Sequence, residues 1–327
     1  MQIMKTSALV SVVVAAYKAE QYIKYCLDSI YAQTYQYIEL IVIDDCSPDR
    51  TYDVALEWAK EHKNRFSRCE VIKNEVNLGI SKNFNKLVKS ASGEYIKIFA
   101  GDDMLLPEAV ETECMYLSET DDEIVFANCV MVGGDSIFPV ELKGSEKLRF
   151  NSIPIHGKGI LEELIKKDYI PAPTVMFRKS TFDTYGYFRE DLAFEDWEYW
   201  LRLASNGCSI GYIDKVIVAY RVWDGGFSHF AKGSEAEKRF VRNTETEEKI
   251  LMEYSKYVPE YDFNAFWNGI VSVCMEHDYK KMLSDVLENK TFKKISLVKI
   301  KLFLYRIHLY KLVFGIVHFL KKKFKKN

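Results

Sequence analysis

The segment that decides the predicted fold is Tyr95-Ile-Lys-Ile-Phe-Ala-Gly-Asp-Asp-Met-Leu-Leu-Pro107. A short apolar strand runs into a loop that carries the adjacent carboxylates Asp102 and Asp103, and Pro107 opens a helix shortly afterwards. Acids at the carboxyl end of a central strand lie where open α/β sheets bind ligands. Because adjacent carboxylates repel each other, a divalent cation that also binds substrate phosphates is the favoured partner. The alternative is an ordinary turn that precedes a helix cap.

Strands and helices alternate on the N-terminal side of this segment. Apolar runs rich in valine and isoleucine predict buried strands at Leu9–Ala16, Glu39–Asp44 and Glu70–Lys73. Helical spacing predicts helices between them, at Ala19–Gln33, from Asp49 through Lys60, and at Ser81–Ser90. This alternation predicts a parallel sheet built from right-handed βαβ units.

Regularity decreases after Pro107. Composition predicts a strand at Glu123–Val132 and a surface loop or insertion at Gly133–Lys158. Residues before proline avoid helical geometry, so Pro171–Phe177 is expected to be extended. An amphipathic helix is expected at Phe194–Ala204, followed by two strands, Ser209–Ile213 and Val216–Val222.

The composition is that of a soluble globular protein, with 48% apolar and 28% charged residues among 327. The net charge is −2, but basic residues crowd the end of the chain at Lys321–Lys326. The seven cysteines show no metal-type spacing, so we expect reduced thiols and no zinc site. No apolar stretch is long enough to span a membrane, and Leu9–Ala16 is interpreted as a strand and not as a signal sequence. A cytoplasmic location is expected.

Four polar clusters fall at strand ends or helix starts. They are Asp44-Asp45, Asn77 with Lys82 and Asn83, Asp102-Asp103, and Glu195-Asp196. The carboxyl ends of parallel strands share one edge of a sheet, so the first three are expected to converge there.

Several ordered motifs between residues 8 and 228 resemble one family. They are Val10–Glu20, Ser29, Gln33–Tyr35, Glu39–Asp49, Asn77–Gly79, Lys82-Asn83, Gly93–Tyr95, Asp102-Asp103, Pro107, Glu195-Asp196, Arg202 and Ala219–Arg221. The chain resembles the inverting glycosyltransferases of family 2, of the kind that builds bacterial cell-surface polysaccharides. The resemblance implies a GT-A fold, an α/β architecture with a Rossmann-like, mixed but mainly parallel sheet flanked by helices, here with a C-terminal helical extension.

The resemblance implies a binding site for the donor nucleotide, UDP most of all. The expected residues are Ala15, Tyr17, Glu20, Asp44, Asp45, Asn77, Lys82 and Asp102. Asp44 matches an aspartate that contacts the base, and a carboxylate accepts the imide N–H of uracil or thymine. Lys82 stands where the family usually has arginine, and its alternative is a solvated helix lysine. Helix capping is the alternative for Asp45 and the preferred interpretation for Asp49.

The resemblance also implies a metal, Mn²⁺ or Mg²⁺, that bridges the donor diphosphate. Asp102 matches the last acid of the Asp-x-Asp motif, while Ala100 stands at its first position. Asp103 is the second expected ligand. In many relatives a histidine follows the Tyr-Arg strand, but here Trp223 occupies about that place, and His229 further on is the remaining candidate.

The catalytic base is expected at Asp196, with Glu195 as the alternative. Inversion needs an acceptor hydroxyl deprotonated on the face of the sugar opposite the diphosphate, and a carboxylate does this in one displacement. The alternative role for this pair is to begin a helix and interact favourably with its dipole. Trp197 is expected to pack in the core, with stacking on an acceptor sugar as the alternative.

The expected organisation is a GT-A domain at residues 1–230, a helical region at 231–292 and a basic amphipathic tail at 293–327. The tail segment Ser296–Phe324 is either an interfacial helix on an anionic membrane or a packing helix. The expected activity is metal-assisted transfer of a sugar from a nucleotide donor to a saccharide or lipid-linked saccharide, with no nucleic acid as partner. The alternatives are a nucleotidyltransferase and a catalytically degenerate sugar- or nucleotide-binding scaffold of the same fold.

Overall fold

The computed structural model describes residues 8–140, 148–150, 152, 154, 156–157 and 159–223, together with isolated positions between 242 and 257. The chain divides into two compact units, residues 1–229 and 230–327. In the second unit the described positions from 242 to 254 are helical. The predicted boundary at residue 292 and the basic tail lie outside the described residues, and no helix among the described residues is both long and apolar enough to cross a membrane.

The N-terminal half alternates strands and helices as predicted. Its elements are β1 (Val10–Ala16), α1 (Ile23–Tyr31), β2 (Ile38–Asp44), α2 (Thr51–His62), the 3₁₀ turn η1 (Lys63–Arg65), β3 (Arg68–Lys73), α3 (Ile80–Ser90) and β4 (Tyr95–Ala100). Every residue of β1 and β2 is buried. A strand covered on both faces needs apolar residues at successive positions, which explains their continuous valine and isoleucine runs.

The second half is less regular. Its elements are β5 (Met104–Leu105), α4 (Ala109–Glu119), β6 (Ile124–Gly133), α5 (Ile160–Lys166), the 3₁₀ turn η2 (Ala172–Thr174), β7 (Met176–Arg178), α6 (Ser180–Tyr185), α7 (Asp196–Ser205) and β8 (Ile210–Val222).

Two predictions for the second half are wrong. The segment Pro171–Phe177 is not extended throughout, because η2 turns the chain before β7 begins. The two strands expected after residue 208 are one strand, β8. A shift in its register against β6 places Asp214 and Lys215 in a bulge, where both are exposed. The bulge accommodates two polar residues without ending the strand.

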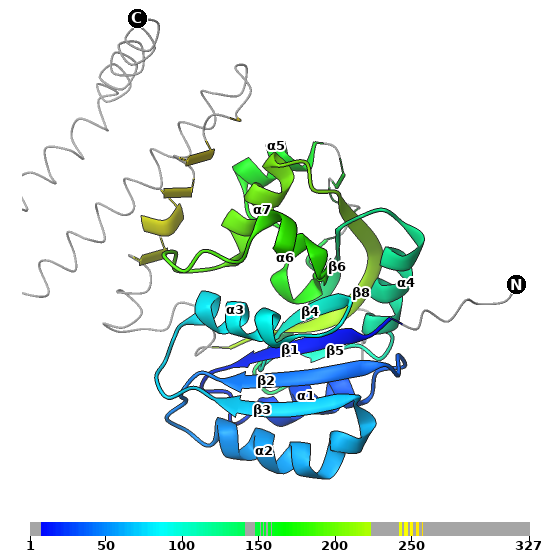
Figure 1. The fold of residues 1–327 in the computed structure, drawn as a ribbon, viewed down its shortest axis with the longest axis vertical. Helices are drawn as coiled ribbons and strands as arrows, with labels where there is room; N and C mark the ends of the chain where they lie inside the picture. The colour runs from blue at the N-terminus through cyan, green and yellow to red at the C-terminus, as the bar shows by residue number, and fades with distance from the viewer. Residues whose placement is uncertain are drawn as a thin grey trace, which may run out of the picture. The chain divides into compact units, whose positions relative to one another are not determined.

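The strands form one mixed, mainly parallel sheet, in the order β3-β2-β1-β4-β7-β6-β8-β5. The first four strands are parallel, and β7 joins β4 to β6 by antiparallel pairing on both sides. β8 runs parallel to β6, and the short β5 pairs antiparallel with β8. Figure 1 shows β1, β2 and β3 side by side in this order.

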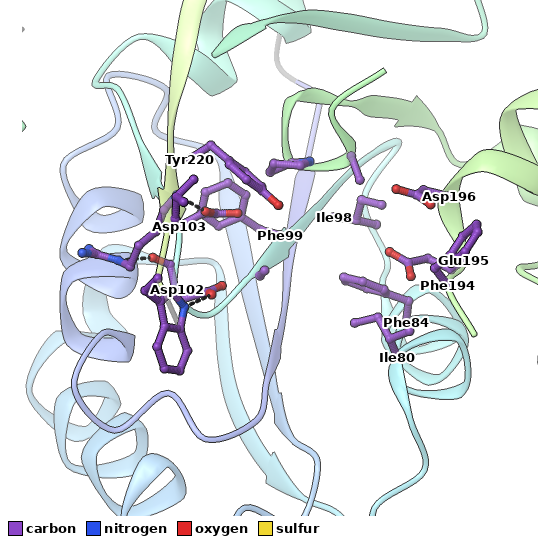
Figure 2. Close-up of a pocket in the computed structure, with 16 residues that line it drawn as sticks. Ile80, Phe84, Ile98, Phe99, Asp102, Asp103, Phe194, Glu195, Asp196 and Tyr220 are labelled. Atoms are coloured by element: carbon purple, nitrogen blue, oxygen red, sulfur yellow. Dashed lines mark hydrogen bonds between the residues drawn. The ribbon is translucent and has the colours of Figure 1, made fainter. Parts of the chain in front are cut away.

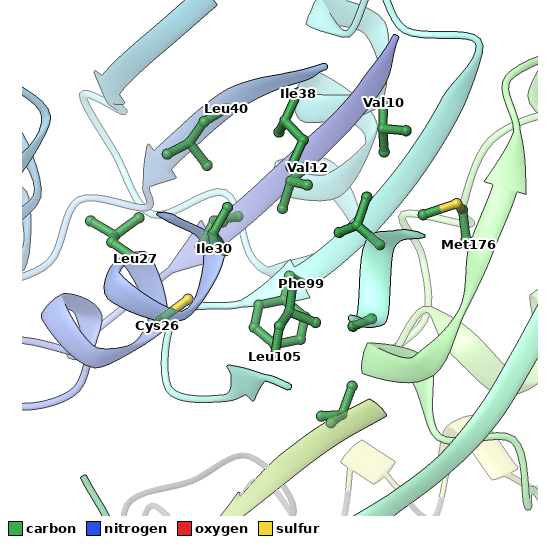
Figure 3. Packing of buried hydrophobic residues seen from close by; sticks show 14 of the residues in the cluster. Val10, Val12, Cys26, Leu27, Ile30, Ile38, Leu40, Phe99, Leu105 and Met176 are labelled. Atoms are coloured by element: carbon green, nitrogen blue, oxygen red, sulfur yellow. The ribbon is translucent and has the colours of Figure 1, made fainter. Parts of the chain in front are cut away.

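Helices cover both faces of the sheet. Alternate residues of β1 and β2 pack with side chains of α1, α2 and α4 on one face, and α3 packs on β1 and β2 from the other. Figure 3 shows Val10 and Val12 of β1 with Leu40 of β2 and with Leu27 and Ile30 of α1. Burying each such side chain stabilises the fold by roughly 1.5–3 kcal/mol. This packing fixes the strands whose carboxyl ends carry the polar clusters.

Candidate active site

The carboxyl ends of the parallel strands bring the predicted clusters to one edge of the sheet. In the parallel register Ala16 of β1 pairs with Asp44 of β2, and Ala15 pairs with Ala100 of β4. The loop that begins at Asp44 and the loop that carries Asp102 and Asp103 therefore leave the same edge of the sheet, on either side of the end of β1.

Asp44 is fully buried at the end of β2. Its Oδ2 accepts a hydrogen bond from the Ser47 N–H at 3.1 Å, while Oδ1 has no hydrogen-bond partner among the described residues. An unpaired buried oxygen of this kind is costly, and it is rare unless a ligand or water completes it.

The carboxylate of Asp45 binds the start of α3. Its Oδ1 accepts from the Leu78 N–H and from the Asn74 side-chain amide, both at 2.8 Å, and its Oδ2 accepts from the Gly79 N–H at 2.9 Å. Gly79, with φ of 80°, allows the loop to turn into the helix at this point. Both oxygens of Asp45 are therefore occupied by the protein.

Of the cluster predicted around α3, Asn83 is buried and accepts from the Asn74 side-chain amide at 3.3 Å, while Asn77 and Lys82 are exposed. Asn77 is exposed, and its Oδ1 accepts from the Gly79 N–H at 3.1 Å. Lys82 is exposed in the first turn of α3, whereas Ile80 and Phe84 line the pocket described below.

The loop after β1 is tied to the loop after β2. The N–H groups of Lys18 and Ala19 donate to the hydroxyls of Ser47 and Thr51, at 3.0 and 2.8 Å. This junction leaves Tyr17 46% exposed beside the buried Ala15, two of the predicted nucleotide-binding residues.

Two acids also connect these loops: Glu20 in the loop after β1 and Asp49 in the loop after β2. Oε2 of Glu20 accepts from the Arg50 N–H at 3.0 Å. Asp49 accepts from the N–H and the hydroxyl of Thr51, the first residue of α2, but the N-cap position is taken by Arg50 and has no side-chain cap bond.

A pocket lies between the two acidic pairs nearer the C-terminus. Figure 2 shows Asp102 and Asp103 on one side of it and Glu195 and Asp196 on the other. Its remaining lining is mostly apolar or aromatic and comes from Ile80, Phe84, Ile98, Phe99, Ala100, Ala172, Pro173, Phe194, Tyr220, Arg221, Val222 and Trp223. Elements from across the sheet thus bring four carboxylates around one cavity.

Residues 221 and 223 at the end of β8 hold the Asp102-Asp103 loop. The Arg221 N–H donates to Oδ1 of Asp103 at 2.8 Å, and Arg221 Nε donates to the backbone oxygen of Asp102 at 2.7 Å. The Trp223 indole N–H donates to Oδ2 of Asp102 at 2.9 Å. Burial raises the pKa of the Asp102 carboxyl, and burial together with the charge of Asp102 raises the pKa of Asp103 well above its usual range.

Glu195 and Asp196 stand at the start of α7, as predicted. Burial, and then the neighbouring charge of Asp196, raise the pKa of Glu195 to about 8. Burial also raises the pKa of Asp196, opposed first by the Trp197 N–H, which donates to its Oδ1 at 2.8 Å, and then by the charge of Arg149. Two neighbouring carboxyls in such a site retain a proton near neutral pH.

Trp197 packs in the core, as expected. It is 6% exposed, and its indole N–H donates to the backbone oxygen of Leu164 at 2.7 Å.

Comparison with known proteins identifies the family. The sequence model described as "Glycosyl transferase family 2" matches residues 11–186, more than half of the chain. The chain belongs to this family.

An uncharacterised glycosyltransferase of Methanocaldococcus jannaschii is 29% identical over 216 residues, which cover 65% of this chain and 71% of the relative. Two solved structures resemble this family 2 glycosyltransferase in fold. TarS of S. aureus, residues 1–349, in complex with UDP-GlcNAc, aligns with a TM-score of 0.55 at 20% identity over 91% of this chain and 92% of TarS. The mannosyltransferase PcManGT from Pyrobaculum calidifontis, solved with GDP-Man and Mn²⁺, aligns with a TM-score of 0.56 at 15% identity over 91% and 80% of the two chains.

These comparisons confirm the predicted GT-A fold and the glycosyltransferase class. They decide against the nucleotidyltransferase alternative, because the model that matches residues 11–186 is one of a glycosyltransferase family.

The glycosyltransferase has a small number of side chains that could bind a divalent metal. No group of three or more His, Cys, Asp or Glu side chains arranged to hold a metal occurs in the part of the chain that the structure describes. His229, a predicted ligand, lies outside that part. The carboxylates of Asp102 and Asp103 nevertheless fit a hard cation, because Mg²⁺ is commonly held by one or two carboxylates and substrate phosphates.

Sequence reasoning missed several residues of the site. Phe84 and Phe194 form part of its apolar wall, and Trp223 contacts a predicted metal ligand. The helical spacing that places Phe84 beside Ile80 was visible, but a core role explains that spacing equally well. The family resemblance placed Trp223 near the metal site, but nothing in the sequence predicts its hydrogen bond to Asp102.

Proposed function

We propose that this glycosyltransferase moves a sugar from a nucleotide-diphosphate donor, a UDP-sugar, to a hydroxyl of a saccharide or lipid-linked saccharide, with inversion at the anomeric carbon. One observation carries the proposal: two pairs of carboxylates line the same pocket from opposite sides. Inversion needs this separation, because the acceptor attacks on the sugar face opposite the leaving diphosphate.

Asp196 is the proposed general base, with Glu195 as the alternative. Once the pair loses its shared proton, Asp196 accepts the proton of the acceptor hydroxyl while that oxygen bonds to the anomeric carbon. The bond from this carbon to the diphosphate oxygen breaks in the same displacement. The apolar walls formed by Phe84 and Phe194 exclude water, which limits hydrolysis of the donor.

Asp102 is the proposed ligand of Mn²⁺ or Mg²⁺, with Asp103 beside it. When bound there, the ion supplies positive charge to the diphosphate oxygens as the nucleoside diphosphate leaves. The mannosyltransferase PcManGT was solved with GDP-Man and Mn²⁺, which supports divalent metal use in this fold. Asp103 keeps the loop in place through its bond from the Arg221 N–H.

The donor nucleotide is proposed to bind at the ends of β1 and β2. The unpaired Oδ1 of Asp44 matches the imide N–H of uracil, which supports a uridine donor. Ala15, Tyr17 and Glu20 form the neighbouring loop. Asn77 and Lys82 are the proposed polar contacts from the α3 side, and a lysine neutralises phosphate as a point charge.

Asp45 has a different proposed role. It shapes the donor site indirectly, since both of its oxygens already bind the protein.

The donor site is tested by calorimetric titration with UDP, dTDP, GDP and CMP, each with and without Mn²⁺. Binding of UDP that strengthens with Mn²⁺ and loses this dependence in Asp102→Asn supports the proposal. If none of the four nucleotides binds under either condition, the active transferase is ruled out and the degenerate scaffold becomes the better account.

The base is tested separately with a donor that binds. Asp196→Asn is expected to retain the donor affinity and to lose at least about 100-fold in transfer or donor-hydrolysis rate. A variant with the wild-type rate would move the assignment to Glu195, where the same substitution by glutamine is then decisive.

The acceptor is proposed to be a cell-surface saccharide that is assembled at the cytoplasmic face of the membrane. The basic run Lys321–Lys326 supports peripheral attachment to anionic lipid, at about 1 kcal/mol per lysine near the surface. The full chain should sediment with phosphatidylserine vesicles at low salt. Reversing the charges of Lys321, Lys322 and Lys323 should release it, and unchanged sedimentation of that variant would refute attachment through the tail.

A further inference from the structure

The indole of Trp223 and the carboxylate of Asp102 form a specific contact at the pocket. Trp223 Nε1 donates to Oδ2 of Asp102 at 2.9 Å, the hydrogen bond drawn beside Asp102 in Figure 2. The two residues are 121 positions apart in the sequence and come from the loop after β4 and the end of β8. The bond occupies one of the two oxygens of the acid proposed to bind the metal.

The ring of Trp223 is held in place by its neighbours. It packs against Tyr22, with ring centroids 4.9 Å apart, and the guanidinium carbon of Arg221 lies 4.5 Å from the centroid of the same Tyr22 ring. A Cβ added at Gly134 would lie 3.1 Å from the Cβ of Trp223, so the chain passes closely on that side. A side chain packed in this way presents its N–H in a fixed direction.

The nearest cation in the described part of the chain, Arg221, acts on the acidic pair through its charge and not through a hydrogen bond to either carboxylate. The Arg221 guanidinium donates to the backbone oxygens of Asp102, Gly133, Gly134 and Ser136, and no bond from it to either carboxylate is found among the described residues. Asp103 accepts from a backbone N–H and Asp102 from an indole N–H, and both donors are neutral. Neutral donors orient a carboxylate and leave its charge available to a cation.

We propose that Trp223 is a positioning residue for the divalent metal: its indole N–H occupies Oδ2 of Asp102, fixes the plane of the carboxylate and leaves Oδ1 for the ion. This inference rests on the proposed function. In metal sites, a carboxylate or carbonyl commonly holds a metal-binding side chain in place by a hydrogen bond, and the Trp223 indole would do the same for Asp102. Removing such a support commonly costs 10-fold to 100-fold in metal affinity.

The test measures the affinity for Mn²⁺ by the electron paramagnetic resonance signal of the free ion, with UDP saturating. Trp223→Phe retains an aromatic ring against Tyr22 and removes the N–H. We expect its affinity for Mn²⁺ to fall by about 10-fold or more, while its affinity for UDP in EDTA stays unchanged.

Trp58→Phe is the matched control. The Trp58 indole also donates to a carboxylate, Oδ1 of Asp28 at 2.7 Å, but this bond joins α2 to α1 and neither residue lines the pocket. Its loss should leave the affinity for Mn²⁺ unchanged. An equal loss in both variants would indicate general destabilisation and overturn the inference.

Two further outcomes contradict the proposal in different ways. If Trp223→Phe binds Mn²⁺ as tightly as the wild type or more tightly, the indole does not support the ligand, and the proposed function stands without it. If the wild type binds no Mn²⁺ in the presence of UDP, metal assistance itself is wrong, and this inference falls with it.

A measurement on the unmodified sequence does not depend on the folding of a variant. In protein labelled with ¹⁵N at the indoles, Mn²⁺ with UDP should broaden the Trp223 N–H resonance and leave that of Trp58 visible. An unaffected Trp223 resonance at saturating metal would place the ion away from Asp102 and refute the proposal.

Discussion

The ammonium group of Lys97 lies 2.6 Å from Oε1 of Glu113, and neither side chain is exposed to solvent. The pair joins β4, the strand that leads to Asp102, to α4 on the same face of the sheet as the main core. Burial raises the pKa of Glu113 to about 7 and lowers that of Lys97, and in each case the partner's charge opposes the effect of burial. The loss of either member of such a buried pair leaves an uncompensated charge in the core, which destabilises the fold.

Removing one member of this pair should destabilise the protein strongly. Glu113→Leu leaves the Lys97 ammonium buried without its partner, and we expect it to lower the free energy of unfolding by about 3–5 kcal/mol. The double variant Lys97→Met with Glu113→Leu should recover most of that loss, because no charge is then buried. Urea denaturation of both variants measures the difference. Equal destabilisation of the single and double variants would mean that the pair contributes through packing volume alone.

The transfer rate should rise with pH through about 8. Burial and the charge of ionised Asp196 raise the pKa of Glu195 to about 8, so above that pH both carboxyls are charged and Asp196 no longer shares the proton of Glu195. Glu195→Gln removes the group whose pKa lies at about 8 and should therefore abolish this rising limb. Profiles of kcat against pH for the wild type and this variant test the assignment. A limb at the same pH in both would show that the pair does not set the rate.

Asp44 should select the base of the donor. In the proposed donor site its unpaired Oδ1 is the acceptor for the imide N–H of uracil, whereas cytosine offers a ring-nitrogen acceptor at that position. Asp44→Asn is expected to weaken UDP binding by about 10-fold to 100-fold, the range of about 1.5–3 kcal/mol for a hydrogen bond to a charged group. The preference for UDP over CDP should fall with it. Asp49→Asn, just before α2, is the control and should retain the preference, since its carboxylate bonds the N–H and hydroxyl of Thr51 and the backbone N–H of Glu20 and is not proposed to contact the base.

Asp45 should matter for stability more than for chemistry. It accepts from the Leu78 and Gly79 N–H groups at the start of α3. Asp45→Ala leaves these donors without their acceptor, and we expect a loss of about 1–3 kcal/mol in the free energy of unfolding. Thermal denaturation compared with Lys82→Ala, an exposed change on the same helix, tests this expectation. A variant with wild-type stability and no UDP binding would instead place Asp45 in direct contact with the nucleotide.

The parallel half of the fold could be predicted from local sequence patterns. Continuous apolar runs and helical spacing are local patterns, so β1, β2 and β4 could be predicted from a few neighbouring residues each. The position of Asp44 and Asp102 at strand ends followed from the same patterns. The start of α7 at Asp196 was equally visible, because acids at a helix start are favoured by its dipole.

Which residues meet at the site depends on how the strands and helices pack together. The partners of Asp45 lie in the loop before α3, and Trp223 contacts Asp102 across 121 positions of sequence. The pairing of Lys97 with Glu113 also depends on how α4 packs on the sheet. Contacts between distant residues depend on strand register and helix packing, which the whole core determines together. Neighbouring residues encode where a strand or helix lies, and the packed sheet decides what its end residues contact.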